Sequence, residues 1–158
     1  MGEYLPDVFD HFDQQLYNHH LALSDKKNPL YSYLLKNKDW LIEEAYDNLL
    51  LINHVLVNDL YRGKKLGLAA IYRTIQKFSH DCRFTILEAV PLQLITKEPL
   101  ERTTMGLNFL EQDKGKATNS LKAYYKKLVF EIVPRSNYMV LDLELRHPSL
   151  DDIGFTAS

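Results

Sequence analysis

The residues from Arg62 to Gly67, RGKKLG, combine basic side chains with glycines in a way that suits the binding of an anion. Gly63 and Gly67 carry no side chain, so a ligand can approach the backbone closely at both positions. Arg62, Lys64 and Lys65 supply local positive charge. A segment of this kind binds phosphate when it opens a helix, because the unpaired N–H groups and the dipole of the helix N-terminus attract negative charge.

The flanking sequence places this loop between a strand and a helix. The run LLLINHVLV over residues 49–57 is typical of a buried strand, and the apolar stripe that follows the loop predicts a helix over about 65–79. The loop is not a Walker A motif, because Leu68 rather than a lysine follows Gly67, and the glycine spacing of a dinucleotide-binding loop is absent. A tight turn with a solvated basic rim explains the loop equally well.

Residues in the two central strands are candidates for accepting a proton. Glu88 is the one carboxylate in the apolar run FTILEAV (84–90), and a buried carboxylate without a partner tends to take up a proton, which suits a base. A strand-end carboxylate that faces water or pairs with a lysine is the alternative. His54 shares a face with Ile52 and Leu56 by the period of two and is a second candidate base, ranked below Glu88 because a hydrogen-bonded core histidine is the commoner case.

Metal chemistry is not predicted. His19 and His20 are adjacent and therefore point in different directions on a helix. Cys82 is the only cysteine, so the chain has neither a zinc-binding cysteine pattern nor a disulfide framework.

The elements that must position these residues follow from the apolar periodicity. We expect helices over 7–23 and 118–128, one broken or two short helices within 30–46, and a short helix near 105–112 in the polar segment 96–117. Besides the strands 49–57 and 84–90, strands are expected over 130–133 and 138–145. The alternation of strands and helices predicts parallel pairing in the middle of the chain, and the closely spaced last strands predict an antiparallel hairpin. The fold class is therefore α/β, a mixed central sheet with helices on both faces.

Composition narrows the class of partner. The chain has 158 residues, 46% hydrophobic and 25% charged, and a net charge of −2, which gives no global attraction to nucleic acid. No apolar run approaches the roughly 20 residues of a membrane span, and the acidic N-terminus lacks a signal-peptide core. We therefore expect a single cytoplasmic domain without nucleic-acid or membrane partners.

The stretch VLVNDLYRGKKLGLAAI (55–71) resembles motif A of the GNAT acyltransferase superfamily, in which Arg/Gln-x-x-Gly-x-Gly/Ala follows a strand and opens a helix. TNSLKAYYKKLVFEIV (118–133) resembles the later helix and strand of that family. The resemblance implies a GNAT-like acyl-CoA acyltransferase core over 49–145, preceded by a helical N-terminal segment (1–48) and followed by a tail (146–158).

The resemblance also implies a function and a site. The function is transfer of an acetyl group from acetyl-coenzyme A (acetyl-CoA) to a primary amine of a small-molecule or peptide acceptor. Tyr125 matches the tyrosine that protonates the thiolate, although an aromatic residue that only packs against the sheet is the alternative, and a backbone N–H near Val57 would hold the oxyanion. Glu88, the candidate from the strand pattern above, would be the base. The residues implied in binding acetyl-CoA are Val55, Val57, Arg62, Gly63, Lys64, Lys65, Leu66, Gly67, Leu68 and Asn119.

The sequence departs from the family pattern at several points. Lys65 and Val129 stand where the family has glycines, and Thr118 takes the place of the family's asparagine, one residue before Asn119. No strand is expected before residue 49, where the family has several. The alternative is therefore a catalytically impaired domain that acts as a CoA-binding or assembly module. An exposed apolar edge at the first strand would also favour closure by a second copy of the chain.

Overall fold

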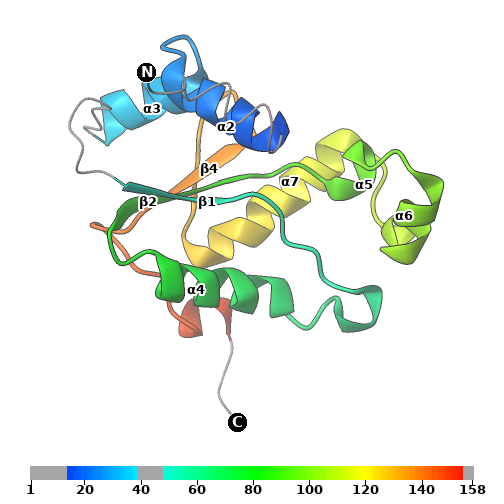
Figure 1. The fold of residues 1–158 in the computed structure, drawn as a ribbon. Helices are drawn as coiled ribbons and strands as arrows, with labels where there is room; N and C mark the ends of the chain where they lie inside the picture. The colour runs from blue at the N-terminus through cyan, green and yellow to red at the C-terminus, as the bar shows by residue number, and fades with distance from the viewer. Residues whose placement is uncertain (1–13, 39–47, 155–158) are drawn as a thin grey trace, which may run out of the picture.

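The computed structural model describes residues 14–38 and 48–154 and has a mixed sheet at its centre (Figure 1). The described strands are β1 (Asn48–Ile52), β2 (Cys82–Glu88), β3 (Glu131–Ile132) and β4 (Tyr138–Asp142), and they lie in the order β1-β2-β4-β3. β1 and β2 are parallel, whereas β4 is antiparallel to both of its neighbours. The predicted parallel pair, the C-terminal hairpin and the α/β class are confirmed.

The helices connect and cover these strands. Helices α2 (Gln14–Ser24) and α3 (Pro29–Asn37) precede the sheet, and α4 (Leu66–Phe78) joins β1 to β2. Between β2 and β3 lie α5 (Leu92–Ile95), α6 (Pro99–Thr104), α7 (Lys114–Tyr125) and the 3-10 turns η2 (Leu107–Phe109) and η3 (Lys126–Leu128). Two further 3-10 turns, η1 (Asp59–Tyr61) and η4 (Asp151–Ile153), precede α4 and follow β4.

Each face of the sheet has its own apolar core, as the prediction of helices on both faces requires. Figure 1 shows α2 and α3 on one side of the strands and α4 on the other. The core under α2 and α3 contains Leu30, Leu34, Phe84, Ile86 and Val140. The core under α4 and α7 contains Leu68, Ile71, Ile75, Leu87, Met139 and Leu141, together with Tyr125 and Leu128.

Several predicted bounds were wrong for identifiable reasons. α7 begins at Lys114, before the predicted residue 118, because the Asp113 carboxylate accepts the N–H of Lys116 at 2.8 Å and caps the helix. Of the short helix expected near 105–112, the described chain has only the 3-10 turn η2, and α5 and α6 precede it. The strand expected over 138–145 ends at Asp142. The expected strand 49–57 ends at Ile52, and its remainder builds the site described below.

The terminal segments belong to the same packed unit as far as they are described. α2 and α3 share the core of β2 and β4, so this part of the predicted segment 1–48 is not a separate body. In the predicted tail, Ile153 is buried against the α4 face of the sheet. The predicted helical residues 7–13 and 39–46 lie outside the described residues.

Candidate functional site

The site begins where β1 and β2 stop pairing. The last pair of the parallel ladder is Ile52 with Leu87, and β2 continues alone with β4 as far as Glu88. Residues 53–58 carry no strand pairing, and in the described chain the backbone N–H groups of Val55 and Val57 donate no hydrogen bond. The parallel strands therefore separate at their carboxyl ends, which is where ligands bind in open α/β sheets.

The side-chain alternation of the first strand shifts by one residue at this separation. Ile52 and Val55 both pack into the core under α4 and α7, although they are three residues apart. Strict alternation would have placed His54 with Ile52, but His54 is exposed. The shift keeps Val55 and Val57 on the α4 side while the backbone leaves the sheet.

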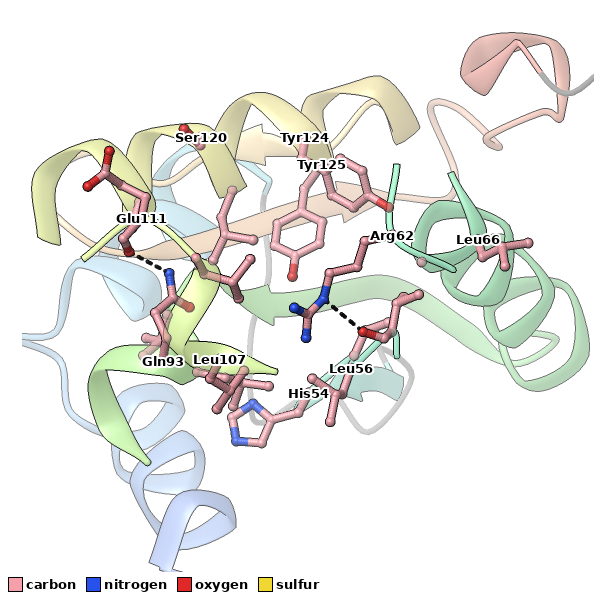
Figure 2. A pocket seen from close by; sticks show the side chains of 18 of the residues that line it. His54, Leu56, Arg62, Leu66, Gln93, Leu107, Glu111, Ser120, Tyr124 and Tyr125 are labelled. Atoms are coloured by element: carbon pink, nitrogen blue, oxygen red, sulfur yellow. Dashed lines mark hydrogen bonds between the residues drawn. The ribbon is translucent and has the colours of Figure 1, made fainter. Parts of the chain in front are cut away.

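A cavity of about 540 Å³ occupies the space between the separated strands (Figure 2). Its walls come from residues 53–57, the loop before α4, the end of β2, α5, η2 and α7. Asn53 and Glu88 belong to the side of the sheet under α2, whereas Val55, Leu121 and Tyr125 belong to the α4 side. Residues of both faces therefore line one cavity, so a ligand on one face can meet a ligand on the other.

The loop before α4 presents backbone donors to this cavity. The N–H groups of residues 63–67 donate no hydrogen bond in the described chain, and α4 has no side-chain cap at its N-terminus. Gly63 has a φ of 79°, and Lys65, the residue before α4, is also left-handed with a φ of 59°. Consecutive free N–H groups at a helix N-terminus form an anion-binding arrangement, so the expectation from the loop sequence has the geometry it needs.

Gly67 is required for a close contact at the start of α4. A Cβ at this position would lie 2.8 Å from the Tyr124 hydroxyl oxygen and 3.3 Å from Cγ2 of Val57. The Tyr124 hydroxyl occupies this space because it accepts the N–H of Leu68 at 3.1 Å. Leu68 itself is fully buried and does not line the cavity.

Arg62 has a structural role that its sequence position did not reveal. Its Nε donates to the carbonyl of Val57 at 3.0 Å, and its Nη1 and Nη2 donate to the carbonyls of Gly106 and Met105. Figure 2 shows the guanidinium in the middle of the cavity wall, bonded to the segment that carries Leu56 and Val57. Arg62 thus connects the separated strand to the α6–η2 segment through three of its five N–H groups, and its positive charge adds to that of the loop.

Tyr125 lies on α7 and lines the cavity, as predicted. Its ring is buried with 9% exposed, and its hydroxyl makes no hydrogen bond in the described chain. Figure 2 shows the two adjacent tyrosine rings, with one hydroxyl directed toward α4 and the other into the cavity. Burial, followed by the neighbouring Tyr124, raises the pKa of Tyr125 to about 12. The phenol therefore stays protonated at neutral pH and can donate a hydrogen bond.

Glu88 lines the cavity at the end of β2, directly opposite Tyr138 on β4. It is half-buried, and its carboxylate has no hydrogen bond or ion pair among the described residues. The predicted alternative of a lysine pair is therefore not found in this part of the chain. Burial, with a smaller contribution from the charge of Glu88, raises the pKa of Tyr138. An unpaired carboxylate beside a cavity is a suitable proton acceptor.

His54 is not the core histidine that the strand pattern favoured. It is exposed and is one of the residues that line the cavity (Figure 2). The alternation shift at the end of β1 accounts for the difference, because it removes His54 from the face of Ile52. His54 stays a candidate base on the open side of the site.

Most of the predicted binding residues come together, and some do not. The predicted residues that line the cavity are Val55, Val57, Arg62, Gly63, Lys65, Leu66, Gly67, Glu88 and Tyr125. Lys64 lies outside it, with its ammonium 5.4 Å from the centre of the Tyr61 ring. Asn119 is exposed on α7 and also lies outside, whereas Ser120 lines the wall.

The far wall of the cavity was missed by the sequence analysis. Gln93 of α5 is buried, and its Nε2 donates to the carbonyl of Glu111 at 2.9 Å (Figure 2). Leu107 of η2 is fully buried and contributes an apolar surface. Pro91, Pro99 and Gly106 were the available signals, because Pro91 and Gly106 directly precede α5 and η2 and Pro99 begins α6.

Other types of site were also considered. Among the described residues, no group of His, Cys, Asp and Glu side chains is suited to hold a metal ion. No described helix combines the length and apolarity that crossing a bilayer requires. Comparison with known proteins finds no matching family model, no matching curated protein and no matching solved structure. The chemistry of the cavity must therefore be argued from its own residues.

Proposed function

We propose that the chain binds acetyl-CoA in the cavity between β1 and β2 and transfers the acetyl group to a primary amine. The observation that carries the proposal is the combination of separated parallel strands with free N–H groups at the start of α4. A pyrophosphate needs donors and positive charge, which residues 63–67 and Lys65 offer. The extended arm of coenzyme A carries amide groups, which need backbone groups that are free to form hydrogen bonds. Residues 54–57 offer such backbone N–H groups.

The residues around the cavity match the requirements of acyl transfer. Bound acetyl-CoA would supply the acetyl group as a thioester. A lysine-like amine with a pKa near 10.4 is mostly protonated at pH 7, so a base must take its proton, and the unpaired carboxylate of Glu88 is assigned this role. Backbone N–H groups at Val55 and Val57 are assigned to the carbonyl oxygen of the thioester, where negative charge develops.

Tyr125 is assigned to the sulfur. Its phenol holds a proton at neutral pH and can donate a hydrogen bond to the leaving thiolate. A pKa of about 12 makes complete transfer to a thiolate unfavourable, because an ordinary thiol has a pKa near 8.5. Tyr125 therefore stabilises the thiolate by hydrogen bonding, and the thiol takes its final proton from solvent or from the one removed from the amine.

The sequence departs from the GNAT pattern at two glycine positions. The backbone conformation at these positions nevertheless supports the resemblance. Lys65 and Val129 replace glycines of the family pattern, and both adopt the left-handed conformation, with φ values of 59° and 60°. This conformation is rare for a lysine and a marked outlier for a β-branched valine, whereas glycine adopts it freely. The backbone at both positions thus has a conformation that glycine would adopt without strain.

A non-catalytic module is the rival function, and the state of Arg62 is the observation that favours it. The guanidinium donates to three carbonyl oxygens, so only two of its five N–H groups stay available for a phosphate in the described chain. Such a module would bind acetyl-CoA, or a protein partner, without turnover. One assay distinguishes the two functions, the release of free thiol from acetyl-CoA in the presence of a panel of primary amines. The enzyme would release thiol, and the module would not.

Calorimetric titration with acetyl-CoA tests the binding site itself. Lys65 lines the cavity, with its ammonium donating to the carbonyl of Gly154 at 3.3 Å, and Lys65→Glu reverses its charge. Lys64→Glu makes the same change one residue away, outside the cavity. We expect Lys65→Glu to weaken binding about tenfold or more through repulsion of the phosphates. Lys64→Glu should cost less than about threefold because its charge is solvated and screened. No binding by the unmodified chain, or equal losses in both variants, would refute the proposal.

A further inference from the structure

A buried polar chain crosses the α2 side of the sheet at the point where β1 and β2 separate. His19 of α2 is only 4% exposed. Its Nε2 lies 3.2 Å from Oδ1 of Asn53, and its Nδ1 lies 3.2 Å from the hydroxyl of Tyr138. The His19 and Tyr138 rings meet edge to face, with their centres 5.7 Å apart. Both ring nitrogens of His19 are therefore used, in a position that excludes water.

The partners fix the tautomer of His19. An amide oxygen can only accept, so Nε2 of His19 donates to Asn53, and Nδ1 then accepts from the Tyr138 hydroxyl. The single hydroxyl hydrogen of Tyr138 is thereby directed to His19. Glu88, opposite Tyr138 on β2, keeps a carboxylate without a partner in the described chain.

Asn53 connects the hydrogen-bonded group of His19, Asn53 and Tyr138 to the cavity. Asn53 is the first residue after the last ladder pair, and it lines the cavity. The segment that follows is held at its far end, where Arg62 donates to the carbonyl of Val57. His19 holds the near end by joining Asn53 to Tyr138, across the intervening strand β2. The unpaired N–H groups of Val55 and Val57 lie between these two contacts.

We infer that His19 is a positioning residue that, through Asn53, keeps the separated strand in the geometry that receives the acyl-CoA arm. This rests on the proposed function for the identity of the ligand. It also makes helix α2 a part of the site, although α2 contributes no residue that lines the cavity. The physical basis is preorganisation, because a segment already held in its binding conformation loses less entropy when the ligand binds.

The test compares variants in helix α2 with a variant of Asn53. His19→Leu removes both hydrogen bonds, and His19→Gln retains a donor and an acceptor. Ala22→Gly is the matched control, because Ala22 is buried in the same helix and the same core but lies outside the polar chain. Asn53→Leu removes the group through which His19 is inferred to act, so its effect should not add to that of His19→Leu.

Two readouts are measured on each variant. Calorimetry with acetyl-CoA should show a loss of about tenfold in His19→Leu, a smaller loss in His19→Gln and less than about threefold in Ala22→Gly. Backbone ¹⁵N relaxation of the ligand-free protein should show lower order at residues 53–57 in His19→Leu, with β4 unchanged. A purely structural histidine would instead give His19→Leu and Ala22→Gly the same losses when matched for stability.

The outcomes separate this inference from the proposed function. Failure of the unmodified chain to bind acetyl-CoA would refute the proposed function, and ¹⁵N relaxation would still decide whether His19 orders residues 53–57. Binding by the unmodified chain, with affinity and order retained in His19→Leu, would refute the role of His19 and leave the proposed function intact.

Discussion

At the residue scale, Lys65 shows how a side chain can depart from a pattern while the backbone keeps it. Its φ of 59° and ψ of 12° place it in the left-handed region directly before α4. An L-residue in this region costs roughly 1–2 kcal/mol, and glycine avoids that cost. The strain is retained at the mouth of the cavity, where the lysine also supplies charge.

Replacement of Lys65 by glycine should therefore stabilise the protein. We expect Lys65→Gly to increase the free energy of unfolding by about 1 kcal/mol, because relief of the left-handed strain exceeds the entropy that glycine adds to the unfolded chain. Lys64→Gly is the control, since Lys64 does not have a positive φ. Urea denaturation measures both, and equal destabilisation by the two changes would contradict the assigned strain.

The proposed role of Tyr125 can be tested directly once an acceptor amine is found. Tyr125→Phe keeps the buried ring and removes the donor to the sulfur. We expect kcat to fall about 10²-fold or more while acetyl-CoA affinity changes less than about threefold. Steady-state kinetics and calorimetry together make the comparison. Full turnover by the variant would assign Tyr125 to packing alone.

The sequence predicted which residues line the cavity better than it predicted the contacts that each one makes. Tyr125, Glu88, Gly67 and Lys65 all line the cavity, because local spacing fixes their place on adjoining elements. The bonds of Arg62 to Met105 and Gly106 could not be foreseen, since these carbonyls lie 43 and 44 residues away in the chain. The same limit hid His19, whose partners come from β4 and from the segment after β1.

At the element scale, the end of β1 is the feature that determines the site. LLLINHVLV is apolar at seven of its nine positions, and the only sign of a break after Ile52 is the polar pair Asn53 and His54, of which asparagine is depleted in strands. The break depends on contacts made elsewhere, including the packing of Val55 on the α4 core and the hold of Arg62 on Val57. The prediction of one continuous buried strand was therefore wrong in both pairing and burial, since only Ile52 of this run is buried and Leu56 is exposed.

The start of α4 offers a test of how one helix positions another. The Tyr124 hydroxyl of α7 accepts the N–H of Leu68, which has no acceptor within α4 at this position. Tyr124→Phe leaves that donor unpaired, and we expect it to lower the free energy of unfolding by about 1 kcal/mol.

Tyr61→Phe is the control for this change. Tyr61 is 53% exposed, and its hydroxyl makes no hydrogen bond in the described chain, so its loss should change stability by less than about 0.5 kcal/mol. Thermal denaturation of both variants measures the difference. Equal melting temperatures would show that the Tyr124 hydroxyl does not support the start of α4.

At the scale of the whole molecule, β1 is the outer strand of the described sheet. Leu49, Leu50 and Leu51 are only half-buried there. Stable proteins cover or pair such an edge, and closure by a second copy of the chain stays a prediction. Sedimentation at low micromolar concentration should then give a mass near twice 18.5 kDa. A monomer at all concentrations tested would show that the edge is not closed in this way.

The central claim is that acetyl-CoA lies between the separated strands with its phosphates at the start of α4. A ¹H–¹⁵N correlation spectrum recorded during titration with acetyl-CoA tests it most directly, because it reports on each backbone N–H group. We expect the largest shifts at residues 63–67 and at 54–57, whose N–H groups donate no hydrogen bond in the described chain. Shifts confined to other elements, or no shift at saturating ligand, would contradict the account.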